Sequence, residues 1–146
     1  MQFYDILCQH TEPQRQQLLG TPLIQQALTG DIDLAQYVAF LTQAYHHVKH
    51  TVPLMMACGS RLGDEQGWLR QAIAEYIEEE IGHEESILSD IAACGGDPQL
   101  ARDSKPLPAT ELMVAYAYHS IDRGNPIGFF GMVHVLEGTS TALATQ

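Results

Sequence analysis

The stretch Tyr76-Ile-Glu-Glu-Glu-Ile-Gly-His-Glu-Glu85 places charged side chains in the middle of an apolar helical stripe. At about 100° per residue, one face of the segment from Asp64 to Cys94 is aliphatic. Its members are Leu69, Ile73, Ile77, Ile87, Leu88 and Ile91. This spacing predicts one uninterrupted helix, capped by Asp64 and stopped by Gly95-Gly96 after Cys94.

Two carboxylates point into the middle of this stripe. They belong to Glu80 and Glu84, and His83 lies on the flank. An isolated carboxylate costs several kcal/mol to bury unless it is paired, protonated or bound to a cation. The alternative is a solvated acidic face, which explains the outer residues Glu78 and Glu79 but not Glu80 or Glu84. The pattern therefore indicates a bound metal ion.

The spacing Glu80-Ile-Gly-His83 supports this interpretation, because Glu-x-x-His places both side chains on one helical face, as in di-iron carboxylate bundles. On the last predicted helix, Glu137 projects from a face that also carries Phe130 and Val133. We therefore predict that Glu80, His83 and Glu137 converge on a non-haem iron or manganese ion. The sequence leaves open whether Glu84 or His134 is a further ligand, and whether one or two metal ions bind.

The remaining segments also carry helical periodicity, so the fold class is predicted as all-α, with 1–146 forming a single helical domain. A long helix is expected from about 33 to 62, with a bend at Pro53. Asp97 to Lys105 is expected to be a polar connector. The other predicted helices lie near 12–19, 22–29, 109–123 and 126–145.

Composition excludes several classes of function. Seven Lys and Arg against eighteen Asp and Glu give 7 − 18 = −11, which disfavours nucleic acid and membrane surfaces as partners. The three cysteines show no CxxC spacing, so neither a disulfide framework nor a structural zinc site is indicated. Without a basic segment like that of a secretory signal before Arg15, the expected location is cytoplasmic. The long amphipathic segments predict a homo-oligomer.

Other reactive side chains give weaker signals. His46 and His50 share a helical face, and a structural role is the favoured interpretation. His119 with Asp122 is interpreted as a capping or surface pair. Cys58 is the one plausible nucleophile for a metal-free hydrolase.

Three stretches resemble the iron-containing redox enzymes of the haem-oxygenase-like superfamily, relatives of the TenA and PqqC proteins. They are Tyr45-His-His-Val-Lys-His-Thr-Val-Pro53, the acidic stretch with Ala92-Ala-Cys-Gly-Gly-Asp97, and Asn125-Pro-Ile-Gly-Phe-Phe-Gly-Met-Val-His-Val-Leu-Glu-Gly138. The resemblance implies a haem-oxygenase-like helical bundle whose active members bind one or two irons and use O2 to oxidise small substrates. It implies Glu80 and His83 as ligands and Glu137 as a bridging carboxylate.

Members of this family complete the site with a further helix that bears a His and an Asp-x-x-His-like set, which this sequence lacks. We therefore favour a fragment that is truncated at its C-terminus over two alternatives, a partner chain that supplies the missing helix and an incomplete site. The expected function is that of a non-haem iron enzyme, with di-iron favoured, which uses O2 to oxidise a small, largely apolar carboxylate or amine. The alternatives are a TenA-like hydrolase, a PqqC-like cofactor-free oxidase, and a metal-free helical interaction module.

Overall fold

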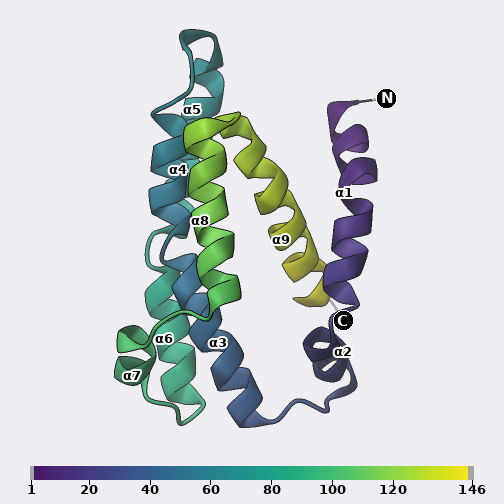
Figure 1. Cartoon of the computed structure of the whole chain (residues 1–146), viewed down its shortest axis with the longest axis vertical. Coiled ribbons are helices and arrows are strands. Elements are labelled where there is room, and N and C mark those ends of the chain that lie inside the picture. Colours follow the sequence, from purple (N-terminus) through teal and green to yellow (C-terminus); the bar gives the residue numbers. More distant parts are fainter. Residues whose placement is uncertain (1, 145–146) are drawn as a thin grey trace. The chain divides into compact units, whose positions relative to one another are not determined.

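In a computed structural model of the chain, residues 2–144 are described, with side chains for residues 2–140. No strand occurs in this part of the chain, so the all-α prediction is confirmed (Figure 1). The elements are α1 (Phe3–Leu19), α2 (Pro22–Thr29), α3 (Leu34–Val48), α4 (Thr51–Gly59), η1 (Asp64–Gln66), α5 (Gly67–Glu80), α6 (His83–Ala93), α7 (Pro98–Asp103), α8 (Pro108–Arg123), η2 (Pro126–Gly128) and α9 (Phe129–Ala144).

The chain divides into two compact units. The central unit is Leu34–Pro126, and the terminal unit combines Met1–Asp33 with Ile127–Gln146. Within the central unit, α3 packs against α6, and α4 packs against both α5 and α8. Within the terminal unit, α1 packs against α9. The single-domain organisation stays a prediction.

One cluster of buried side chains in the central unit lies between α3, α6 and α7. Its buried members are Leu41, Tyr45, Leu88, Ile91 and Ala101, with Val38 and Ile87 packed against them. The spacing Leu41–Tyr45 on α3 and Leu88–Ile91 on α6 turns one face of each helix toward the other. Full burial of each large aliphatic side chain contributes about 1.5–3 kcal/mol, which holds the two helices together.

The first long helix is broken at a different place from the one predicted. Instead of one helix bent at Pro53, α3 ends at Val48 and α4 begins at Thr51. A proline ring clashes with the carbonyl four residues earlier, which here belongs to Lys49. The chain therefore breaks before Pro53 and restarts with the proline in the first turn of α4, where its missing N–H is tolerated.

The second long helix is also divided, so the prediction of an uninterrupted helix from Asp64 to Cys94 is wrong. The chain forms η1, then α5 to Glu80, then α6 from His83. Gly82, between α5 and α6, has φ of 93°. This left-handed conformation costs free energy for any L-residue, which carries a Cβ atom, but not for glycine. The apolar periodicity continues across this break, which is why the stripe alone did not reveal it.

The other expected helices are found with adjusted limits. Helix α1 begins at Phe3 instead of near residue 12 and carries Pro13 in its interior. The expected polar connector contains α7, which Asp97 caps by accepting hydrogen bonds from the backbone N–H groups of Gln99 (2.9 Å) and Leu100 (3.1 Å). Helices α2 and α8 match their predictions, and residue 145 of the last predicted helix lies outside the described residues.

None of the helices in the described part of the chain combines the length and the apolar character needed to cross a bilayer.

Candidate metal centre

The acidic stretch places a buried carboxylate beside an imidazole. Glu80, the last residue of α5, is 9% exposed, and His83, the first residue of α6, is exposed. The Nδ1 atom of His83 lies 3.0 Å from Oε2 of Glu80, so the ring N–H donates to the carboxylate. The two residues are therefore brought together, although across a helix break and not on one continuous helical face.

Burial along the stripe separates Glu80 from the surrounding carboxylates. Glu78, Glu79 and Glu85 are exposed, and Glu84 is half-buried. A solvated acidic face accounts for the exposed three, as expected, but not for Glu80. The hydrogen bond from His83 compensates part of the cost of burying this carboxylate. The start of α6 next to it adds the positive end of a helix dipole.

The geometry of the Glu80–His83 pair fits two ligands of one metal ion. Ligands about 2.1 Å from an ion and at right angles to each other lie about 3.0 Å apart. The observed separation of Nδ1 and Oε2 is 3.0 Å. Imidazole nitrogen and carboxylate oxygen are also the donors that non-haem iron prefers. These two residues therefore fit part of an iron site.

A third donor is not found beside this pair in the described residues, where no group of three His, Cys, Asp or Glu side chains could hold a metal ion. Glu137 lies on α9, in the terminal unit, and its side chain is exposed. The sequence placed Glu137 on an apolar face with Phe130 and Val133, whereas its side chain is exposed and these two neighbours are only half-buried. Its convergence with Glu80 and His83 stays a prediction.

His134, which the sequence left open as a ligand, has other partners. Its Nε2 atom lies 3.0 Å from Nη1 of Arg15 and 3.9 Å from Sγ of Cys8. A guanidinium at hydrogen-bond distance repels a cation, so this nitrogen is poorly suited to bind a metal.

His46, on α3, and His50, directly before α4, have structural contacts. His46 is 2% exposed, and its Nε2 atom lies 2.8 Å from Oγ of Ser104. Burial lowers the pKa of His46, and the nearby ammonium of Lys49 lowers it further. His50 Nδ1 lies 3.2 Å from the Tyr118 hydroxyl. These contacts connect α3 and α4 to α7 and α8, which agrees with the structural role favoured from the sequence.

Three further side chains bear on the earlier interpretations. Asp122 forms an ion pair with Arg61 at 2.5 Å, a partner that the spacing to His119 did not suggest.

Cys58 is 0% exposed, its thiol donates to the carbonyl of Pro126 at 3.3 Å, and burial raises its pKa. A buried thiol with a raised pKa is a poor nucleophile, so Cys58 does not support the metal-free hydrolase.

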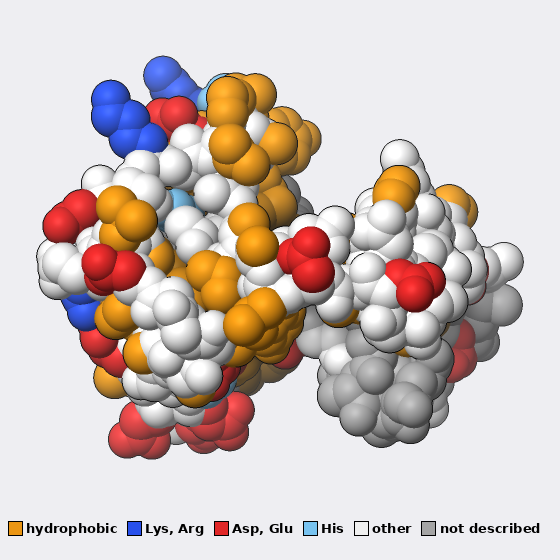
Figure 2. Space-filling model, turned by 90° about the horizontal axis from the view of Figure 1, so that it is seen from below, with side chains coloured by type: hydrophobic (Ala, Val, Ile, Leu, Met, Phe, Trp, Pro, Cys, Tyr) orange, Lys and Arg blue, Asp and Glu red, His pale blue; other side chains and the backbone are white. Residues whose placement is uncertain are grey.

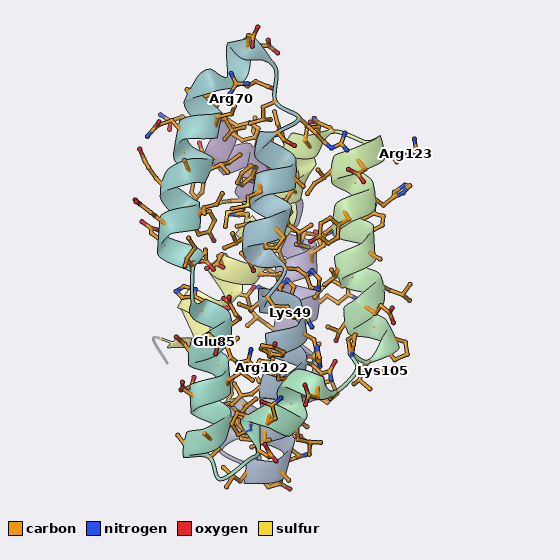
Figure 3. All side chains as sticks on the ribbon, turned by 90° about the vertical axis from the view of Figure 1, so that its left-hand side faces the viewer. Lys49, Arg70, Glu85, Arg102, Lys105 and Arg123 are labelled. Atoms are coloured by element: carbon orange, nitrogen blue, oxygen red, sulfur yellow. The ribbon has the colours of Figure 1, made fainter. Side chains whose placement is uncertain are left out.

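An ion pair that the sequence did not predict lies close to the Glu80–His83 pair. Nη2 of Arg102, on α7, lies 3.0 Å and 2.8 Å from the two carboxylate oxygens of Glu85, on α6 (Figure 3). The exposed acidic residue next to the candidate centre thus ties α7 to α6. An arginine in the last turn of a Pro-initiated helix was the available signal.

Comparison with known proteins places these features in a family. A family model described as iron-containing redox enzyme matches residues 38–146. The crystal structure of a domain of unknown function with a heme oxygenase-like fold, from Shewanella denitrificans OS217, is 29% identical with a TM-score of 0.77. The match covers 99% of this chain and 67% of that one, and confirms the haem-oxygenase-like fold. None of the curated proteins matches. The chain belongs to the family of iron-containing redox enzymes.

Proposed function

We propose that this protein is a non-haem iron enzyme that uses O2 to oxidise a small, largely apolar carboxylate or amine. The observation that carries the proposal is the buried carboxylate of Glu80, paired at 3.0 Å with the imidazole of His83 in a chain of the iron-containing family. Bound iron would supply the redox chemistry with O2 that protein side chains lack. The residues of the chain supply ligands, orientation and protection from water.

Glu80 and His83 are the first two ligands in this proposal. In the metal-free protein, the Nδ1 proton of His83 lies between the two donors. A metal bound to both Nδ1 and Oε2 would replace this hydrogen bond, with the ring proton of neutral His83 on Nε2 instead. The low exposure of Glu80 keeps water away from the carboxylate and strengthens its interaction with a cation.

Glu137 is the proposed bridging carboxylate. It supplies a third donor of the same hard type, and half-buried Glu84, next to His83, is available as a fourth. Several carboxylates with one imidazole suit two irons, so we propose a di-iron centre. The proposed substrate is apolar because the helix that carries Glu137 begins with Phe129 and Phe130, whose rings pack edge to face.

The test is anaerobic titration with Fe(II), followed by measurement of O2 uptake. We expect the wild-type chain to bind iron, and the substitutions Glu80→Gln and His83→Ala each to lower iron binding at least about tenfold. Glu78→Gln is the matched control, because it removes an exposed carboxylate from the same turn of α5 and should leave iron binding unchanged. Equal iron binding by all four proteins, or none by the wild type, would overturn the proposal.

A further inference from the structure

His46 stands in a chain of hydrogen bonds in which every proton can be assigned. Nζ of Lys49, directly after α3, lies 3.2 Å from Nδ1 of His46, and an ammonium can only donate. Nδ1 is therefore an acceptor, and neutral His46 donates from Nε2 to Oγ of Ser104 at 2.8 Å. The Ser104 hydroxyl donates in turn to the carbonyl of Ala101 at 2.8 Å. Both ring nitrogens are thus used, and the ring ties α3 to the end of α7.

A further proton on His46 has no acceptor in this arrangement. It would be placed on Nδ1, where the new N–H would face the Lys49 ammonium. That ammonium also lies over the Tyr45 ring, 5.2 Å from its centre, which holds it beside His46. The His46 side chain is 2% exposed, so water cannot solvate an imidazolium while its surroundings stay in place. Burial, with the charges of Lys49 and His50, accordingly lowers the pKa of His46.

The helices packed against α3 do not supply a compensating carboxylate. In the described part of the chain, only Lys49 and His50 act on the charge of His46, and both disfavour the cation. The nearby groups of α6, α7 and α8 have other partners: Glu85 pairs with Arg102, Asp103 accepts from Gln99, and Tyr118 contacts His50. Lys105, which follows Ser104, is exposed. Acidification therefore acts against the closed contact, and nothing around it offsets the effect.

Helix α7 is the part of the surroundings that can move at the lowest cost. It has six residues, too few for an isolated helix to be stable in water. Its Leu100 is exposed, and this end of the central unit faces the viewer in Figure 2, where hydrophobic side chains lie among charged ones. The ion pair of Arg102 with Glu85 is solvent-exposed and contributes little. A hollow of about 300 Å³ is lined by residues of both α6 and α7. The burial of Ala101 and the His46–Ser104 hydrogen bond are therefore the main attachments of α7.

We propose that α7 is an acid-sensitive latch, which opens when His46 becomes an imidazolium. In the closed state, the neutral ring holds Ser104, and Ala101 packs with Leu88 and Ile91 of α6. In the open state, α7 separates from α3 and α6, and water solvates the imidazolium. Opening exposes the apolar side chains of α6 and releases the carboxylate of Glu85 from α7. Acid thus changes the surface that lies two residues beyond His83.

Amide hydrogen exchange of the intact, metal-free chain between about pH 7.5 and 5.5 tests the latch. The intrinsic rate divided by the observed rate at each pH gives a protection factor, which removes the chemical effect of pH. The N–H groups of Ala101 and Ser104, which donate to Asp97 (3.1 Å) and Leu100 (3.0 Å), report on α7. Because an unperturbed histidine has a pKa of about 6.5, we expect their protection to fall about three- to tenfold over this range.

Three variants test the role of His46. His46→Gln can still accept from Lys49 and donate to Ser104 but cannot take up a proton, so protection in α7 should no longer depend on pH. His119→Gln is the matched control, because it removes an exposed histidine of α8 and should leave the dependence unchanged. Lys49→Met removes the ammonium and should weaken the dependence, since the closed state is then easier to protonate.

Low concentrations of urea separate opening of the latch from unfolding of the whole unit, because a local opening exposes little surface. We expect urea to speed the exchange of α8 more than that of α7. The proposal would be overturned by α7 protection that stays constant with pH, that falls equally in His46→Gln, or that responds to urea as strongly as α8 does.

Discussion

Replacing Gly82 by Ala tests the break between α5 and α6 directly. Gly82 has φ of 93°, and a Cβ atom built there meets nothing within 4 Å. The cost of the substitution is therefore conformational and not steric. A left-handed conformation costs an L-residue roughly 1–2 kcal/mol, so Gly82→Ala should lower the free energy of unfolding by about that amount. The ratio of folded to unfolded molecules should fall about 5- to 30-fold.

Gly67→Ala, at the first residue of α5, is the matched control. Gly67 has helical angles, φ of −55° and ψ of −36°, and its nearest contact to an added Cβ is the end of the flexible Arg70 side chain at 3.9 Å. Alanine restricts the unfolded chain, so this change should stabilise the protein by about 0.4–1 kcal/mol. Urea denaturation of the metal-free proteins, followed by circular dichroism, measures both. Stabilisation by both substitutions would refute the left-handed break at Gly82.

The core, a helix cap and a buried histidine give further predictions. Ile91→Ala should cost about 2–5 kcal/mol in urea denaturation, because Ile91 is 0% exposed, whereas exposed Leu100→Ala should change stability by no more than about 0.5 kcal/mol. Asp97→Ala should cost about 0.5–2 kcal/mol through loss of the α7 cap, and Asp97→Asn should retain most of it; equal losses would argue against capping. Burial and Lys49 lower the folded-state pKa of His46, so the unfolded state binds more protons and stability should fall as pH drops below about 6.5 toward the lowered folded value. His46→Gln should reduce that slope in urea midpoints measured between pH 8 and 5, and an unchanged slope would exclude His46 as its source.

The all-α class was predictable because the helical period of the apolar residues and the helix-capping residues indicate helices whatever the tertiary packing. The stripe containing Ile73, Leu88 and Ile91 is buried as its spacing predicted. Helix limits were harder to predict, because single residues set them. Pro53 was recognised as a disruption, but its ring acts on the carbonyl four residues earlier, so the break precedes it. The apolar period continues on both sides of Gly82, so it predicts a helix through this residue.

The part of the candidate centre that comes from one short stretch of sequence was predictable. Glu80 and His83 are three residues apart in the chain, so their side chains lie close together even though a helix break separates them. Glu137 is 54 residues beyond His83 and belongs to the other unit, so its position depends on tertiary packing that periodicity does not encode. The same reason explains why the cluster of Cys8, Arg15 and His134 was not foreseen, since it joins the two ends of the chain.

The break at Gly82 changes what determines the spacing of the two proposed ligands. In a continuous helix, residues three apart are held at one separation, since each residue advances about 1.5 Å along a shared axis. Here Glu80 ends one helix and His83 begins the next, so the torsions of Ile81 and Gly82 set the distance between their donor atoms. A small rotation at these two residues can widen or narrow the pair while α5 and α6 keep their own packing. The distance between the two donor atoms can therefore change without a change in the stability of the bundle.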